Sequence, residues 1–201
     1  ALDRLKLGGQ ATGFPQMSGS GRIAGRAVTV RLGTGDPPPG PPRHLGTTAI
    51  EAANPGDIIV VEQRAGVEAG CWGGLLTVGA MQRGVAGVIA DGPVRDIDEA
   101  RSYGFPIYTN KITSLTARGR VVEKETNGPV QIGSVTVNAG DYVVADNSAS
   151  IFIAPGNVEA VLRTAEEIIE RETAMAAAIR AGVPISQVMG GNYEHMLEGS
   201  K

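Results

Sequence analysis

Cysteine and long apolar runs are scarce in this 201-residue sequence, and both absences limit what the protein can be. The single cysteine, Cys71, cannot form an internal disulfide, and no Cys/His cluster has the spacing of zinc ligands. These features exclude a structural zinc site and are typical of a reducing compartment, so we expect a cytoplasmic protein. Apolar runs such as Val85 to Ala90 are far shorter than the roughly 20 residues that span a bilayer, so no membrane partner is expected.

An excess of one charge is also missing. The 18 Lys and Arg residues stand against 21 Asp and Glu residues, which gives a net charge of -3. No basic block is long enough to follow a phosphate backbone, so nucleic acid is not an expected partner. The opening residues, ALDRLKLGG, lack the charged-then-apolar order of a secretory signal and are instead typical of a helix that ends at Gly8 and Gly9.

Glycine, by contrast, is abundant. The 29 glycines are about twice the number usual for this length, which indicates tight turns and close backbone contacts. Hydrophobic residues make up 42% of the chain, enough to bury a core. Since a domain takes roughly 150 residues, residues 1–201 are expected to form a single domain.

The first half of the chain is predicted to alternate strands and helices. Apolar or β-branched runs predict strands at Arg22 to Leu32, Ile58 to Val61, Val85 to Ala90 and Phe105 to Tyr108. A short helix is predicted from Thr47 to Ala53, with Thr47 or Thr48 as its N-cap, and a second helix from Leu75 to Arg83. The order strand, helix, strand indicates parallel strands joined by crossovers.

The second half of the chain changes character. Short apolar runs between Arg120 and Ile153 are separated by Gly, Asn and Asp, which predicts antiparallel strands. From Val158 the apolar residues recur at helical spacing, so an amphipathic helix is predicted as far as Arg180. This helix and the polar tail from Gly190 to Lys201, together about residues 157–201, are expected at a subunit contact.

A glycine-proline tract, GTGDPPPGPP at residues 33–42, interrupts the first half. Its five prolines predict a stiff, extended loop with few backbone hydrogen bonds. Two interpretations stay open, a rigid surface excursion or a wall over a pocket.

The densest group of chemically useful residues is Asp91-Gly92-Pro93-Val94-Arg95-Asp96, directly after an apolar run. Sites in α/β sheets gather beyond the carboxyl ends of strands. On a turn fixed by Gly92 and Pro93, the two acids can coordinate a hard cation while Arg95 binds an anionic substrate. The alternative is a structural turn in which Asp91 caps backbone amides and Arg95 pairs with Asp96.

A second candidate is the pair Gly73-Gly74, which precedes the helix predicted from Leu75. Free N–H groups at a helix start, with no side chain in the way, bind carboxylate or phosphate oxygens well. Ordinary turn chemistry is the alternative explanation for the two glycines.

Three motifs in fixed order carry a resemblance to a known family. They are G-D-I-I-V-V at residues 56–61, G-V-A-G-V-I-x-D-G-x-V-R-D at residues 84–96 and F-P-I-Y at residues 105–108. With them, the sequence resembles regulator of ribonuclease activity A (RraA) and the class II 4-hydroxy-4-methyl-2-oxoglutarate / 4-carboxy-4-hydroxy-2-oxoadipate aldolases over about Ala1 to Arg180. The resemblance implies an α/β fold, an α/β/β/α sandwich with a swivelling-domain-like core, assembled as a homotrimer or homohexamer with sites at subunit boundaries.

The aldolase branch of this family implies roles for several residues. Asp96 would hold a divalent cation, Mg²⁺ or Mn²⁺ or another, largely through water, and Arg95 would contact substrate oxygen. The backbone amides of Leu75 and Leu76, which follow Gly74, match positions that receive the substrate carboxylate. This agrees with the anion-binding role that the paired glycines suggest independently.

The resemblance also implies a glutamate from the C-terminal helix of a neighbouring subunit. Glu170 and Glu172 are the nearest matches to that glutamate, and Glu172 is our choice for the catalytic set with Arg95 and Asp96.

One position departs from the aldolase signature, which is an aspartate, twenty residues and then Arg-Asp. Counting back from Arg95 places Gly74 where that aspartate belongs. Its loss bears on the proton transfer of aldol cleavage more than on the binding of metal or 2-oxoacid. Three residues that are near in sequence are candidates to replace it, namely Glu68, Cys71 and Asp91.

These residues favour a metal-dependent lyase that acts on a 2-oxoacid, because a divalent cation stabilises the enolate formed when a C–C bond breaks. The reactions are retro-aldol cleavage of a 4-hydroxy-2-oxoacid and oxaloacetate decarboxylation, both through a pyruvate enolate. A different reaction on a related hydroxy- or oxo-acid is one alternative, and a non-catalytic ribonuclease-binding regulator is another. His44 and His195 are expected to be structural or surface residues, and Cys71 a packed residue, since no histidine is close to it.

Overall fold

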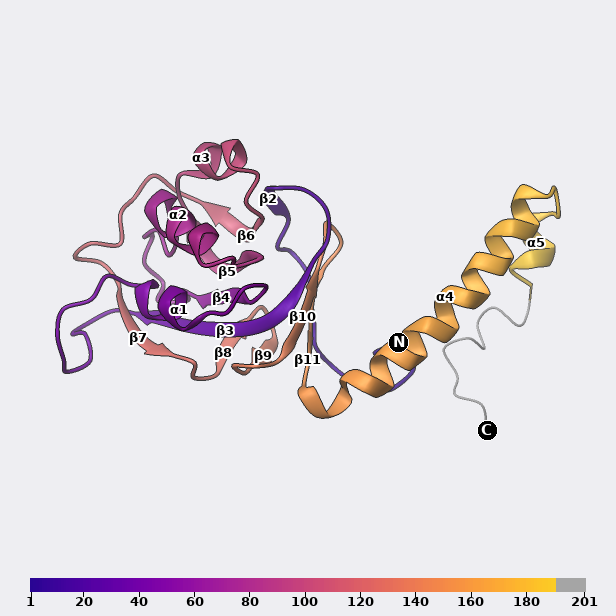
Figure 1. Cartoon of the computed structure of the whole chain (residues 1–201), viewed down its shortest axis with the longest axis horizontal. Helices are drawn as coiled ribbons and strands as arrows, with labels where there is room; N and C mark the ends of the chain where they lie inside the picture. Colours follow the sequence, from indigo (N-terminus) through magenta and orange to yellow (C-terminus); the bar gives the residue numbers. More distant parts are fainter. Residues whose placement is uncertain (191–201) are drawn as a thin grey trace. The chain divides into compact units, whose positions relative to one another are not determined.

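Figure 1 shows the computed structural model of the chain, which describes residues 1–190. The predicted tail beyond Gly190, and with it His195, lies outside the described residues. The described chain divides into two compact units, one formed by Gln10–Ala154 and one by Ala1–Gly9 together with residues 155–190. The single domain expected for residues 1–201 stays a prediction.

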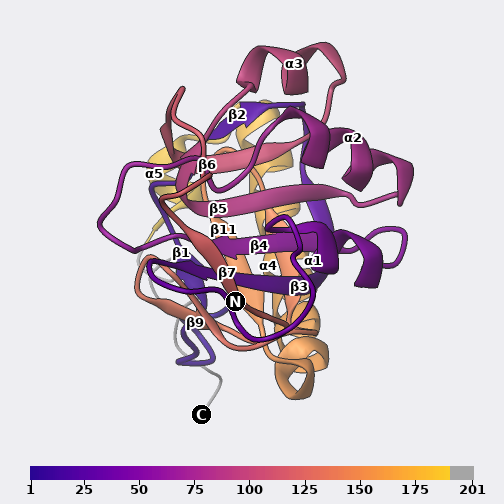
Figure 2. The same ribbon diagram turned by 90° about the vertical axis from the view of Figure 1, so that its left-hand side faces the viewer.

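A mixed sheet forms the frame of the Gln10–Ala154 unit, in the order β1-β11-β10-β3-β4-β5-β6-β2, with β7 also paired to β3. Four central strands run parallel and lie side by side in Figure 2, namely β3 (Ile23–Gly33), β4 (Ile58–Glu62), β5 (Gly87–Val94) and β6 (Ile107–Ile112). The antiparallel pairs involve β1 (Gln10–Ala11), β2 (Gln16–Ser18), β7 (Val122–Thr126), β10 (Tyr142–Ala145) and β11 (Ser150–Ile153). The predicted parallel and antiparallel halves are therefore both confirmed.

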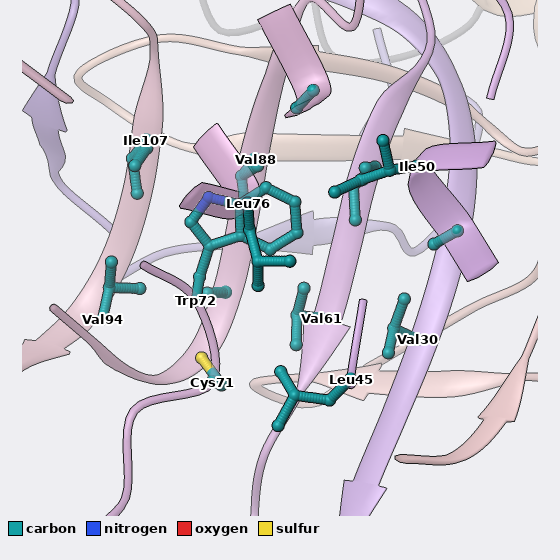
Figure 3. Packing of buried hydrophobic residues seen from close by; sticks show 14 of the residues in the cluster. Val30, Leu45, Ile50, Val61, Cys71, Trp72, Leu76, Val88, Val94 and Ile107 are labelled. Atoms are coloured by element: carbon teal, nitrogen blue, oxygen red, sulfur yellow. The ribbon is translucent and has the colours of Figure 1, made fainter. Parts of the chain in front are cut away.

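Helices cover one face of the parallel strands. They are α1 (Thr47–Ala52), α2 (Gly74–Gln82) and α3 (Ile97–Ser102), and each connects two neighbouring parallel strands (Figure 1). Figure 3 shows the apolar cluster on this face, where Trp72 and Leu76 pack with Val61 and Val88. The buried Trp72 indole donates a hydrogen bond to Thr77 Oγ1 at 3.0 Å, so the start of α2 is fixed against the sheet.

The opposite face of the sheet is covered by strands. The hairpin of β8 (Val130–Ile132) and β9 (Val135–Val137) packs there through a second apolar cluster, which includes Ile89, Tyr108 and Ile132. With helices on one face and strands on the other, the predicted mixed α/β fold is confirmed.

The other unit contains η1 (Pro155–Asn157), α4 (Val158–Arg180) and α5 (Ile185–Val188). Helix α4 has the predicted bounds. It buries Val161 and Thr164, while Leu162 and Ile169 are 53% and 60% exposed. Within residues 1–190, no helix is long and apolar enough to cross a membrane.

Two predictions about helix ends are wrong. Residues 1–9 form hydrogen-bonded turns rather than the end of a helix, and Lys6 has the positive φ of 54°. The N-cap of α1 is Gly46, with φ 79°, and not Thr47 or Thr48. The Thr47 hydroxyl instead donates to the carbonyl of His44 at 2.7 Å, so it closes the preceding turn.

The predicted turn at Gly92 and Pro93 is also wrong, because both residues continue strand β5. A shift in the register between β5 and β6 after Ala90 accommodates the proline, which has no N–H to donate. Gly92 has φ 155°, and a Cβ there would lie 2.7 Å from Gln63 Cβ, so only glycine fits this position of the strand.

Candidate functional site

Two segments that are about twenty residues apart meet at the end of strand β5. The stretch before α2 runs beside the end of β5, with Cys71 N–H donating to Pro93 O at 2.7 Å and Arg95 N–H donating to Trp72 O at 3.1 Å. Trp72 and Val94 form a parallel bridge. This pairing brings the start of α2 next to Arg95 and Asp96, as the resemblance implies.

Asp96 links the two segments through one carboxylate oxygen. Its Oδ2 accepts hydrogen bonds from the Gly74 N–H at 2.9 Å and from Arg95 Nε at 3.0 Å. The other oxygen, Oδ1, has no hydrogen-bond partner within residues 1–190. Asp96 has φ 62° and ψ 35°, a left-handed conformation that Asp adopts more readily than most residues, and it directly precedes α3.

Glycines allow the charged side chains to approach this backbone closely. A Cβ at residue 73 would lie 2.9 Å from Asp96 Oδ2 and 3.1 Å from Arg95 Nε. A Cβ at residue 70 would lie 3.2 Å from Arg95 Cδ. Gly70 and Gly73 thus leave the space in which the side chains of Arg95 and Asp96 lie.

The start of α2 offers free backbone donors. Its N-cap is Gly73, which supplies no side-chain cap, and the first bond along the helix runs from Thr77 N–H to Gly73 O. The N–H groups of Leu75 and Leu76 precede that bond and have no partner in the described part of the chain. The Gly74 N–H is already donated to Asp96, so within the predicted substrate set Leu75 and Leu76 are the two available anion donors.

Arg95 is the cationic group at the site. Its side chain is 41% exposed, and Nε bonds Asp96 while the two terminal nitrogens have no partner within residues 1–190. A guanidinium held at one nitrogen in this way keeps the other two as donors for an incoming anion.

Asp91 does not join the site, so the interpretation in which both acids coordinate one cation is wrong. The two contacts named by the alternative are present, since Asp91 accepts from a backbone N–H and Arg95 pairs with Asp96. The Asp91 carboxylate accepts hydrogen bonds from Asn110 Nδ2 at 2.7 Å and from Gly133 N–H at 2.9 Å. Gly133 lies between β8 and β9, on the sheet face opposite the helices. The physical reason is the strand itself: Asp91 and Gly92 extend β5, so the acids at residues 91 and 96 do not share a turn.

The structure argues against two of the proposed replacements for the missing aspartate. Cys71 is buried in the apolar cluster shown in Figure 3, and this burial raises the pKa of its thiol to about 12. Asp91 is held on the other face. Glu68, the third, bonds Thr113 Oγ1 at 3.2 Å and lies 3.6 Å from Lys111 Nζ, in a surface pairing of its own.

The remaining predicted residues belong to other elements of the chain or are not tested. Glu170 and Glu172 are exposed on α4, in the other unit, so the role of Glu172 stays a prediction. His44 is exposed, and its Nδ1 lies 2.9 Å from the carbonyl of Leu45, in agreement with a surface role.

One acidic residue near the site was missed by the sequence reasoning. A Cβ at residue 74 would overlap Glu99 Oε2 and would lie 3.5 Å from Asp96 Oδ2. Glu99 comes three residues after Asp96 on the short helix α3, a spacing that places the two side chains near each other. This spacing was the available sequence signal.

The donor set at Asp96 suits a cation that keeps most of its water. Residues 1–190 contain no group of three or more His, Cys, Asp or Glu side chains that could hold a metal. Asp96 Oδ1 accepts no hydrogen bond within residues 1–190, so this oxygen is available as a metal ligand. Mg²⁺ is commonly bound through one or two carboxylates and several waters, so these residues fit that ion.

Comparison with known proteins gives the family. The model of the RraA-like family, described as Aldolase/RraA, matches residues 1–151. A putative 4-hydroxy-4-methyl-2-oxoglutarate aldolase of Halalkalibacterium halodurans is 29% identical over 163 residues, which cover 81% of this chain and 74% of that protein. Protein DlpA of Legionella pneumophila is 27% identical over 193 residues, and this match covers 93% of the chain but 30% of DlpA.

Solved structures agree with this result. The crystal structure of Streptomyces coelicolor RraAS2, whose title calls it an unusual member of the RNase ES inhibitor RraA protein family, superposes with a TM-score of 0.72 at 25% identity. The superposition covers 86% of this chain and 85% of RraAS2. From its motifs, its sheet and these matches, the chain belongs to the RraA-like family, Aldolase/RraA.

Proposed function

We propose that this protein is a divalent-metal-dependent carbon–carbon lyase that acts on a 2-oxoacid. The reaction is retro-aldol cleavage of a 4-hydroxy-2-oxoacid, oxaloacetate decarboxylation, or both, through a pyruvate enolate. Family membership supports an aldolase-type lyase, as do relatives named 4-hydroxy-4-methyl-2-oxoglutarate aldolase or putative 4-hydroxy-4-methyl-2-oxoglutarate aldolase. The observation that carries the proposal is the Asp96 carboxylate, which holds Arg95 and the start of α2 together beside two free amides.

Each group has a role in binding. The N–H groups of Leu75 and Leu76 receive the substrate carboxylate, and the N-terminal end of α2 adds its partial positive charge. The free terminal nitrogens of Arg95 donate to the keto oxygen, where negative charge develops as the enolate forms. Asp96 positions both sets of donors, because its Oδ2 bonds the Arg95 guanidinium and the Gly74 N–H.

A divalent cation, Mg²⁺ or Mn²⁺ or another, would be held at Asp96. When bound, it supplies Lewis acidity that polarises the keto carbonyl and stabilises the enolate. Glu172 from the α4 helix of a neighbouring subunit completes the proposed site, in a homotrimer or homohexamer in the cytoplasm.

Two alternatives have specific support. Gly74 at the signature aspartate favours a different reaction on a hydroxy- or oxo-acid, since residue 74 itself has no side chain that could transfer a proton. The likeness to RraAS2 favours a regulator that binds a ribonuclease and needs no catalytic carboxylate.

The test is pyruvate release from oxaloacetate and from 4-hydroxy-4-methyl-2-oxoglutarate, with Mg²⁺ and then with excess EDTA. We expect turnover that requires the metal and is lost in Asp96→Ala. Absence of turnover with every 2-oxoacid tried, together with stoichiometric binding of a ribonuclease, would favour the regulator.

A further inference from the structure

We propose that Glu99 is the acid–base group of this site and that its carboxylate takes the place of a side chain at residue 74. The inference rests on the proposed lyase function and names the group that moves the proton in it. It follows from the packing around Gly74, and from the partners of the acidic residues on α3.

Carboxylate oxygens occupy the position where a side chain on residue 74 would begin. A Cβ on this residue would overlap Glu99 Oε2, and Asp96 Oδ2 would be 3.5 Å away. Gly74 has no positive φ and sits in the first turn of α2, so its backbone conformation does not call for glycine. The Glu99 carboxylate therefore occupies the place that a side chain at residue 74 would take, and such a side chain would displace it.

Within residues 1–190, Glu99 differs from its acidic neighbours because no cationic side chain pairs with it. Asp98 pairs with Arg101 at 2.9 Å, and Asp96 pairs with Arg95 at 3.0 Å. The Glu99 carboxylate forms no hydrogen bond or ion pair within residues 1–190, although it lies against the start of α2. An exposed carboxylate without a partner is able to accept and return a proton, whereas the paired ones are engaged in positioning.

The location also suits proton transfer. The N–H groups of Leu75 and Leu76 directly follow Gly74, so a substrate carboxylate bound there lies in the first turn of the helix that Glu99 touches. Asp96 is occupied with two hydrogen bonds on Oδ2, and Arg95 is a permanent cation. Among the described residues of these two segments, Glu99 is the carboxylate left for acid–base work.

In the proposed reaction, Glu99 both removes and returns the proton, so no other acid or base is needed. Its carboxylate takes the proton of the C4 hydroxyl, and the oxygen electrons form the new carbonyl as the C3–C4 bond breaks. The electron pair of that bond moves through C3 and C2 to the keto oxygen, which gives the enolate of pyruvate. The Glu99 carboxylic acid then returns the proton to C3, so pyruvate leaves and the carboxylate is restored.

The experiment uses the full-length protein with Mg²⁺ and three measurements. They are pyruvate release from 4-hydroxy-4-methyl-2-oxoglutarate, exchange of the pyruvate methyl protons with D₂O followed by NMR, and the pyruvate dissociation constant from calorimetry. The variants are Glu99→Gln, Glu99→Ala and the double variant Gly74→Asp with Glu99→Ala, which returns a carboxylate from the other segment. Asp98→Asn is the matched control on the same helix.

We expect Glu99→Gln and Glu99→Ala to slow both release and methyl exchange by a factor on the order of 10²–10⁴, the usual contribution of a positioned acid–base group. Pyruvate affinity should stay within about threefold, because the proposed binding groups are elsewhere. The double variant should exchange the methyl protons of pyruvate about tenfold or more faster than Glu99→Ala does. Asp98→Asn should release pyruvate and exchange its methyl protons at the wild-type rates.

Three results would overturn the inference. One is a rate of methyl-proton exchange in Glu99→Gln that equals the rate in the wild type. Another is a loss of pyruvate affinity that matches the loss of rate, which indicates a binding or structural role. The third is a double variant no faster than Glu99→Ala. A wild type that binds pyruvate but neither exchanges its methyl protons nor releases pyruvate contradicts the proposed function itself, and the inference falls with it.

Discussion

At the scale of single residues, Asp96 combines a conformational and an electrostatic role. Its left-handed backbone turns the chain from β5 into α3, while its carboxylate joins Arg95 to the start of α2. Asn also adopts the left-handed conformation readily, so Asp96→Asn keeps the turn and removes the charge.

For Asp96→Asn we therefore expect a folded protein whose kcat/KM for pyruvate release falls about 10²-fold or more, as for loss of a group that stabilises developing charge. The Mg²⁺ concentration that gives half-maximal rate should rise in parallel. Steady-state kinetics over a Mg²⁺ series check this, with Asp98→Asn as the control. Unchanged Mg²⁺ dependence in Asp96→Asn would contradict the role given to this carboxylate.

Cys71 illustrates a residue whose chemistry is suppressed by its surroundings. Burial raises the pKa of its thiol from 9.0 to about 12, so the thiolate is scarce at pH 8. We expect no alkylation by iodoacetamide at pH 8 in the native protein and complete alkylation in guanidinium chloride, as read by mass spectrometry. Rapid native alkylation would show that the thiol is accessible and would remove the argument against a nucleophilic Cys71.

The same pKa shift has a consequence for stability. The unfolded chain ionises its thiol near pH 9, whereas the folded chain retains the proton until about pH 12. The contribution of Cys71 to the free energy of unfolding is thus fully present below pH 9 and is lost as the pH rises toward 12. Cys71→Ser removes this part of the pH dependence.

At the scale of elements, strand β5 departs from ordinary pleated geometry at one glycine. Gly92 has φ 155°, and a Cβ there would meet Gln63 Cβ at 2.7 Å and Gln63 O at 2.9 Å. Gly104 also has a positive φ, 66°, but open space around it. The two glycines therefore differ both in backbone conformation and in the space around the Cβ position.

We expect Gly92→Ala to lower the free energy of unfolding by about 2–4 kcal/mol, since overpacking adds to backbone strain. Gly104→Ala should cost about 1–2 kcal/mol, the strain alone. Urea denaturation measures both. Equal losses in the two variants would contradict the expectation that the Gln63 contacts and the backbone conformation at residue 92 together cost more than the left-handed conformation at residue 104.

Several elements were predictable because their signals are local. The apolar run Ile58 to Val61 is β4 apart from its last residue, and helical periodicity gave α4 as Val158–Arg180. The end of β5 was not predictable in this way, because Gly and Pro are turn signals and a register shift makes them tolerable only when the neighbouring strand is present. That error misplaced Asp91, whose partners are Asn110 and Gly133.

The candidate site was predictable in part. The resemblance paired Asp96 with the start of α2, and the free amides followed from the position of two glycines before a helix. Glu99 was not found, because its relation to Gly74 depends on where a side chain on α3 meets the backbone of α2. The three-residue spacing indicates that Glu99 lies near Asp96, but it does not show that Glu99 reaches the backbone of α2.

At the scale of the whole molecule, the proposed site requires the assembly of several subunits. The proposed homotrimer or homohexamer would bring Glu172 from a neighbouring subunit to Asp96, so that each site would be formed by two chains. In light scattering we expect three or six times the chain mass of 20.7 kDa. A monomer at the concentration that supports activity would exclude a shared site.

A shared site also predicts complementation between two inactive variants. Asp96→Asn and Glu172→Gln, unfolded together in equal amounts and refolded, should regain about one quarter of the wild-type activity, because random mixing restores about one site in four at a heterologous interface. Each variant refolded alone should remain inactive. No recovery in the mixture, with normal assembly, would place both residues in the same chain or Glu172 outside the site.

The central claim is that one 2-oxoacid site lies between Asp96, Arg95 and the first free amides of α2. The most direct measurement is an NMR titration of the ¹⁵N-labelled protein with pyruvate in the presence of Mg²⁺, following the N–H signals of Leu75 and Leu76. We predict that these two signals shift with pyruvate, and that the shifts weaken in Asp96→Asn. Saturating shifts elsewhere with Leu75 and Leu76 unmoved would contradict the account.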